Sequence, residues 1–188
     1  MSDYKWLNQF AGGIKGLAYL HRNNISHSDF KLPNVTVGKK GGVLIDIGST
    51  VNKKDIGKKV QIKYKHGEQG AYYVDAEGKA KWVPQDPRFT DSKLLAASVD
   101  GRLPLDAADK YSVGKSIMDF LDMKGYEVNA DSPKHVKELH ALAHNLINVK
   151  KHPYKYKNND PKNGLDPRYV SLQDLPATLS KIAIKFKN

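Results

Sequence analysis

The strongest limit on the fold comes from a polar stretch early in the chain and a second polar group soon after it. The stretch is His27-Ser28-Asp29-Phe30-Lys31-Leu32-Pro33-Asn34, and Asp46-Ile47-Gly48 begins twelve residues after Asn34. Between them, segments 35–37 and 43–45 are rich in β-branched residues, and segment 38–42 is rich in glycine and lysine. This pattern predicts two short strands joined by a turn. Such a hairpin would return Asp46 to the other polar residues.

The residues gathered in this way match the needs of phosphoryl transfer. That reaction requires a carboxylate near the attacking hydroxyl, a cation on the migrating phosphoryl group and oxygen ligands for magnesium. These groups are present as Asp29, Lys31, Asn34 and Asp46. We therefore expect a catalytic site at this loop.

These residues also give the chain a resemblance to the C-terminal lobe of eukaryotic-like Ser/Thr protein kinases. Six positions match the catalytic loop and metal-binding motif of that family: His27, Asp29, Lys31, Asn34, Asp46 and Gly48. Segment 17–27 resembles the helix that leads into the catalytic loop, and the resemblance covers nearly the whole chain. It implies a kinase-like C-lobe that uses ATP and Mg²⁺ and takes a protein as its substrate.

The resemblance implies a role for each residue of the loop. Asp29 would orient the substrate hydroxyl and accept its proton, and Lys31 would contact the γ-phosphate. Lys31 is the Ser/Thr-type choice at its position rather than the tyrosine-type one. Asn34 and Asp46 would hold magnesium. The floor beneath the adenine would include two hairpin residues, Thr36 and Ile45.

Structural roles follow from the same resemblance. His27 would pack in the core beneath the loop, and Gly48 would complete the metal-binding motif. Asp109 would begin a central buried helix and anchor the backbone of the catalytic loop. An ordinary acidic residue favoured by the helix dipole would also account for Asp109. Asp166-Pro167-Arg168 resembles the arginine-containing segment before the last helix of the lobe.

Several departures from the family pattern bear on activity. Ser28 replaces the usual arginine, which removes the main counter-charge for a phosphorylated activation loop. Ile47 replaces phenylalanine, and segment 91–95 has Lys93 where the family's Ala-Pro-Glu has glutamate. The activation segment, about 46–95, is long. Residues 1–188 contain no counterpart of the glycine-rich loop, strand lysine and helix glutamate of an N-lobe, so a second chain or segment would have to supply them.

Composition narrows the class of protein further. Lys and Arg number 31 against 20 Asp and Glu, which gives a net charge of +11. This balance favours acidic partners, although a merely solvated basic surface also explains it. The absence of cysteine excludes disulfides and zinc–thiolate sites. No apolar run is long enough to span a bilayer or to form a signal-peptide core. We expect a soluble, cytoplasmic protein, with secretion or translocation into another cell left open.

The apolar periodicity predicts one α+β domain over residues 1–188, mainly helical with short β-hairpins. Helices are expected at about 4–22, 106–123, 133–149 and 174–186, and segment 150–170 is expected to be a loop. Asp3, Asp106 and Ser132 are the expected N-caps, with Pro133 in the first helical position. Strands at 60–64, 71–74 and 79–83 are expected to form an antiparallel meander.

Three functions are consistent with this sequence. The first is a Ser/Thr kinase C-lobe that works with an N-lobe from elsewhere. The second is an inactive pseudokinase-type scaffold or binding module, which the missing N-lobe elements favour. The third is a binder of nucleic acid or of an acidic partner, suggested by basic runs at 53–54, 58–59 and 150–151 with tyrosines nearby. Nucleotide binding that depends on Asp46 separates the first two, and steep salt dependence would support the third.

Overall fold

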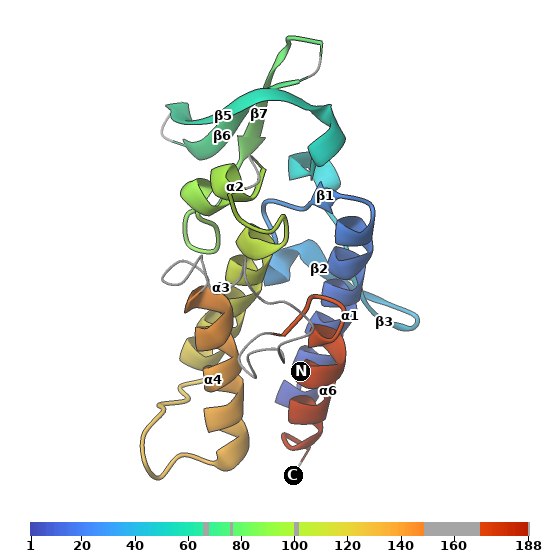
Figure 1. Cartoon of the computed structure of the whole chain (residues 1–188). Helices are drawn as coiled ribbons and strands as arrows, with labels where there is room; N and C mark the ends of the chain where they lie inside the picture. Colours follow the sequence, from blue (N-terminus) through green and yellow to red (C-terminus); the bar gives the residue numbers. More distant parts are fainter. Residues whose placement is uncertain (66–67, 76, 100–101, 149–169, 188) are drawn as a thin grey trace, which may run out of the picture.

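Helices and short antiparallel strands make up the fold, which confirms the expected α+β class (Figure 1). The computed structural model describes residues 1–65, 68–75, 77–99, 102–148 and 170–187. In these residues the helices are α1 (Asp3–Arg22), α2 (Ser92–Val99), α3 (Ala107–Met123), α4 (Lys134–Ile147) and α6 (Leu175–Ile184). None of these helices is both long and apolar enough to cross a membrane.

The strands pair in three separate groups. The two-residue strands β1 (Ile25–Ser26) and β4 (Val51–Asn52) pair with each other, and β2 (Val35–Gly38) forms a hairpin with β3 (Gly41–Leu44). A three-stranded sheet contains β5 (Ile56–Lys65), β6 (Glu68–Asp75) and β7 (Ala80–Pro84), in that order. The expected hairpin and meander are therefore confirmed. The β1–β4 pair was not expected, and β3 ends one residue before Ile45.

One apolar core joins helices α1, α3, α4 and α6. Its fully buried members include Leu7, Phe10, Ile14 and Leu17 from α1, Ile117 and Phe120 from α3, Leu139 from α4 and Leu179 from α6. Trp6 stacks on Phe120 with a distance of 4.0 Å between ring centroids. Burial of each large side chain contributes about 1.5–3 kcal/mol. This core holds α1 and α3, the two helices from which the polar loop is positioned.

The long segment between residues 46 and 95 folds into regular structure. The sheet of β5, β6 and β7 lies at one end of the molecule, next to α2 (Figure 1). A second, smaller apolar cluster joins the base of this sheet to the helices through Val51, Val83, Leu94, Leu95, Leu103, Ala107 and Ala108. Helix α2 was not expected from the sequence. It begins after Asp91, whose carboxylate accepts hydrogen bonds from the backbone of Lys93 and Leu94.

The predicted N-cap of α1 was wrong by one residue. The Ser2 hydroxyl accepts a hydrogen bond from the backbone nitrogen of Lys5, and Asp3 is the first helical residue. The Asp3 carboxylate instead lies 2.7 Å from Lys124 Nζ and accepts a hydrogen bond from the Tyr126 hydroxyl. Burial, together with this hydrogen bond, raises the pKa of Tyr126 to about 12. Asp3 thus ties the start of α1 to the end of α3.

Two other expected caps also differ from the structure. Asp106 occupies the N-cap position of α3, but its carboxylate caps no backbone group and lies 2.8 Å from Lys110 Nζ. At α4 the cap position is taken by Pro133, so the first helical residue is Lys134. The Ser132 hydroxyl hydrogen-bonds within the preceding loop, to Asn129 and Glu127. The Asp106 carboxylate and the Ser132 hydroxyl thus interact with groups other than the free backbone nitrogens at the helix ends.

The β2–β3 hairpin rests directly on α1 through glycine. A Cβ atom on Gly12 would lie 2.5 Å from the backbone nitrogen of Gly42, and one on Gly42 would lie 1.7 Å from the carbonyl oxygen of Gln9. Real Cβ atoms do not approach backbone so closely. The glycines of α1, which weaken an isolated helix, are therefore what allows the hairpin to approach it.

We predict that Gly12→Ala destabilises the protein by about 1–3 kcal/mol, because the added methyl group pushes the hairpin away from α1. Helix propensity alone would give the opposite result, a gain of about 1 kcal/mol. Urea unfolding measures the difference, with Lys15→Ala on the exposed side of α1 as the control. A Gly12→Ala variant as stable as the unaltered protein would contradict the close contact.

Candidate active site

The backbone of the polar loop is held by the carboxylate of Asp109. One oxygen, Oδ2, accepts hydrogen bonds from the backbone nitrogen of His27 at 2.8 Å and from the Ser26 hydroxyl at 2.9 Å. The other, Oδ1, accepts from the backbone nitrogen of Ser28 at 2.9 Å. Asp109 is completely buried in the first turn of α3. A carboxylate that only balanced a helix dipole would not need these partners.

A histidine from α1 completes the surroundings of this carboxylate. His21 Nε2 lies 2.6 Å from Asp109 Oδ2. Burial alone would raise the pKa of Asp109. The hydrogen bond from His21, the charges of His21 and His27, and the hydrogen bond from the His27 backbone outweigh burial, so the pKa is lowered. The ionised form is therefore the one that the folded protein stabilises. Ser26 and His21 were not recognised from the sequence as partners of Asp109.

The held backbone adopts a rare conformation. Ser28 has φ of +69°, in the left-handed region that non-glycine residues seldom occupy. Its backbone nitrogen is bonded to Asp109 and its carbonyl oxygen accepts from the Gln85 side chain at 3.1 Å. Such strain persists where the surroundings fix both ends of the residue, and it is often found at functional sites.

Asp29, Lys31 and Asn34 come together as expected. Lys31 Nζ lies 2.9 Å from Asp29 Oδ2, and the Asn34 side chain donates to the Asp29 carbonyl oxygen at 2.9 Å. Asp29 and Asn34 are buried, while the Lys31 side chain is about one-fifth exposed, at 20%. Pro33 lies in a short 3-10 turn, Leu32–Asn34, that leads directly into β2. This turn orients the Asn34 side chain back toward the loop.

Residues 85–92 also contact the loop, which the sequence did not predict. The backbone nitrogen of Asp86 donates to Asp29 Oδ1 at 3.0 Å, and Asp86 Oδ2 lies 3.6 Å from Lys31 Nζ. Lys31 therefore sits between two carboxylates. Hydrogen bonding to Arg88, and to a smaller extent the charge of Lys31, lowers the pKa of Asp86 despite its partial burial. Gln85 reaches Ser92 as well as Ser28, which fixes the start of α2 to the loop.

Asp46 follows the hairpin and is exposed. The backbone nitrogen of Ile45 donates to the Asn34 carbonyl oxygen at 2.8 Å, so the residue before Asp46 is fixed to Asn34. Asp46 has φ of +55°, also in the left-handed region, and Gly48 lies in the short turn after it. A Cβ atom on Gly48 would lie 3.4 Å from Asp46 Oδ1. The hairpin thus brings the chain back to Asn34 immediately before Asp46.

The donor atoms of Asn34 and Asp46 suit magnesium. The nitrogen of the Asn34 amide is used by Asp29, which leaves its oxygen for a metal, and Asp46 offers an exposed carboxylate. Magnesium commonly takes one or two protein oxygens and completes its shell with water and substrate phosphate. No group of three or more His, Cys, Asp or Glu side chains gathers for a metal within the described residues. A site that shares its ion with a nucleotide does not require one.

The expected adenine floor lies on the outer face of the hairpin. Val35 and Leu44 are paired across the hairpin and face the core. Thr36 pairs with Val43 on the opposite face, where Val43 and Ile45 are 49% and 42% exposed. With Ile47 at 64%, these residues form an exposed apolar surface next to Asp46.

His27 is completely buried beneath the loop. Its ring makes an edge contact with Phe30 and its Nε2 lies 3.4 Å from the Ile45 carbonyl oxygen. It therefore links the loop to the end of the hairpin. Two other expectations, Asp166-Pro167-Arg168 and the basic run at 150–151, lie outside the described residues. No known protein family matches the chain, and no curated protein is similar enough to count as a relative.

We predict that Asp109→Asn destabilises the protein by about 3–5 kcal/mol, because an amide cannot accept the loop's hydrogen bonds as the carboxylate does. The pKa of Asp109 is lower in the folded state than its ordinary value of 3.8. The ionised Asp109 carboxylate therefore contributes its full stability at any pH above the ordinary pKa. That contribution is lost as the pH falls from the ordinary pKa through the folded-state pKa.

Urea unfolding across the acid range measures both effects. The unaltered protein should lose stability more steeply than Asp109→Asn as the pH falls. Asp131→Asn, on an exposed loop, is the control and should keep the acid dependence of the unaltered protein. Equal slopes for Asp109→Asn and the unaltered protein would show that the carboxylate does not hold the loop as an anion.

Proposed function

We propose that this chain is the C-lobe part of a kinase-like phosphotransferase, which moves the γ-phosphate of ATP to Ser or Thr hydroxyls of a protein. The observation that carries the proposal is the pair of hydrogen bonds that the Asp109 carboxylate accepts from the backbone nitrogens of His27 and Ser28. It fixes the loop on which Asp29, Lys31 and Asn34 are grouped. Packing alone requires no such polar arrangement. The groups of the N-lobe would come from another chain or segment.

In this proposal the chain's own residues place the reactants and handle one proton. Asp29 accepts the proton of the attacking hydroxyl, and its carboxylate is positioned for this by the backbone of Asp86. Lys31, held between Asp29 and Asp86, contacts the migrating phosphoryl group. Asn34 and Asp46 would hold Mg²⁺, which neutralises phosphate charge when it is bound.

Residues 85–92 have a direct part in this arrangement. The Asp86 backbone and the Gln85 side chain bond to the loop on either side of the Ser28–Asp29 peptide. They limit how Asp29 can turn, so that a substrate hydroxyl would meet the carboxylate in one orientation. The position of this segment would therefore influence catalysis through its contacts with Ser28 and Asp29.

A scaffold function is the second candidate, and one observation favours it. Lys31 already has two carboxylate partners, and the apolar residues Val43, Ile45 and Ile47 are exposed beside Asp46. A surface of this kind can bind a partner without nucleotide. The nucleic-acid hypothesis rests, as in the sequence, on the net charge of +11 and on the basic runs at 53–54, 58–59 and 150–151.

We predict that the chain binds ATP in calorimetric titration only when magnesium is present, and that Asp46→Ala removes this binding. The reason is that Asp46 supplies the carboxylate through which the metal would hold the phosphates. Asp131→Ala is the matched control, because it removes an exposed carboxylate far along the chain. If Asp46→Ala still binds ATP, the result would contradict the proposed metal site and favour the scaffold function.

We predict that Asp29→Ala abolishes phosphotransfer while magnesium-dependent ATP binding is retained, because Asp29 acts on the hydroxyl and not on the nucleotide. Transfer of labelled phosphate to Ser/Thr peptides measures the first effect, and calorimetry the second. Full transfer by Asp29→Ala would remove Asp29 from this role. Absence of transfer by the unaltered chain, together with absence of ATP binding, would favour the scaffold.

A further inference from the structure

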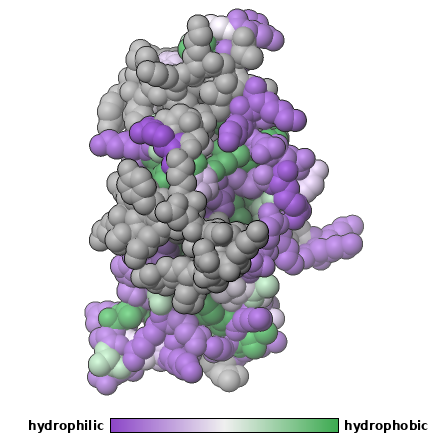
Figure 2. All heavy atoms as spheres, in the orientation of Figure 1, coloured by the Kyte–Doolittle hydropathy of each residue, from purple (hydrophilic) through white to green (hydrophobic). Residues whose placement is uncertain are grey.

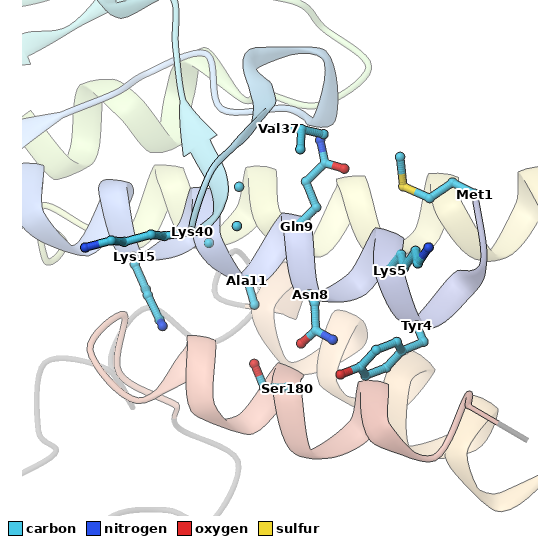
Figure 3. Close-up of a pocket in the computed structure, with 13 residues that line it drawn as sticks. Met1, Tyr4, Lys5, Asn8, Gln9, Ala11, Lys15, Val37, Lys40 and Ser180 are labelled. Atoms are coloured by element: carbon cyan, nitrogen blue, oxygen red, sulfur yellow. The ribbon is translucent and has the colours of Figure 1, made fainter.

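A groove runs along α1 on a part of the surface that the candidate active site does not use. It lies between α1, the turn of the β2–β3 hairpin and α6, and its volume is about 620 Å³. Figure 3 shows the residues that line it, from α1, the hairpin and α6. None of them is Asp29, Lys31, Asn34 or Asp46. The groove therefore raises a question separate from phosphoryl transfer.

The charge of the groove is of one sign. Among the residues that the structure describes, its lining includes Lys5, Lys15 and Lys40 but no aspartate or glutamate. Within the described residues these lysines make no ion pair, and all of them are exposed. Lys187 adds a further positive charge beside the lining residue Tyr4, with its Nζ 4.5 Å from the ring centroid. An acidic occupant would meet cations that pair with no carboxylate of the described part of the chain.

The cations stand at the two ends of the groove. In Figure 3, Lys15 and Lys40 lie at one end and Lys5 lies with Tyr4 toward the other. Lys5 and Lys15 are ten residues apart on one helix, which corresponds to about 15 Å. A single phosphate cannot reach both ends, whereas about five residues of an extended peptide can.

Apolar and amide groups lie between the charged ends. Val37 is 67% exposed on the hairpin side, and Ala11 forms part of the floor. Asn8 of α1 and Ser180 of α6 add polar atoms that can bond to a peptide backbone (Figure 3). Aliphatic side chains fit this middle section better than sugars and phosphates do. Figure 2 shows hydrophilic atoms projecting from the side of the molecule where Figure 1 places the hairpin turn.

We propose that this groove is a docking site for an acidic segment of a protein partner, with acidic residues at both ends and aliphatic residues between them. Lys5 receives one acidic end and Lys15 with Lys40 receives the other. The aliphatic residues of the segment lie against Val37 and Ala11. The contact of Gly12 with Gly42 holds the hairpin close enough to α1 to form the wall of this groove.

Fluorescence anisotropy with a labelled peptide, glutamates at both ends and leucines between them, tests the proposal on the full chain. Reversing the groove charges in the triple variant K5E/K15E/K40E should weaken binding at least tenfold, because each acidic end then meets like charge. The matched control is K54E/K93E/K134E, which reverses three exposed lysines elsewhere and leaves the same net charge. It should keep most of the affinity.

Further measurements separate the groove from general attraction to a basic protein. V37D should weaken binding as well, and a peptide with glutamine in place of glutamate should not bind. Equal weakening by the two triple variants would overturn the proposal. So would displacement of the peptide by oligodeoxythymidine at lower concentration than by unlabelled peptide, which would identify a nucleic-acid surface instead. Thermal unfolding of each variant checks that the exposed substitutions leave the fold intact.

Discussion

The buried carboxylate of Asp109 is the interaction on which the arrangement of the loop depends. Removing a carboxylate from water is costly, and only hydrogen bonds of good geometry compensate. Here the Ser26 hydroxyl, two backbone amides and the His21 ring provide them. These donors belong to α1, to β1 and to the loop, while Asp109 belongs to α3. The loop can therefore take its strained shape only when the two helices are packed together.

The sequence predicted the parts of the site that have local signals. The glycines at 38 and 41–42 indicated the hairpin, and the hairpin returned Asp46 to the vicinity of Asn34. Helical periodicity indicated α3, so that Asp109 could be placed at its beginning. The resemblance to kinases added an anchoring role for Asp109, and the structure shows the hydrogen bonds that such a role requires.

Contacts between distant segments had no such signal. Asp86 reaches Asp29 across 57 positions of sequence, and a single aspartate before a proline reads only as a turn residue. The β1–β4 pair is two residues long, which is too short to show alternation. At the start of α1, Ser2 and Asp3 are both good N-caps. The choice of Ser2 depended on Lys124 and Tyr126, which are far along the chain.

The sheet of β5, β6 and β7 has both of its ends attached to the same short stretch of chain. At one end Asn52 pairs with Ile25, and at the other Gln85 binds Ser28. The residues between Asn52 and Gln85 thus leave the segment 25–28 and return to it. The entropic cost of closing such a loop rises only slowly with its length. The sheet is therefore an insertion that can vary independently of the loop. Its length and sequence can diverge, or be replaced in the laboratory, while the geometry around Asp29 is inherited unchanged.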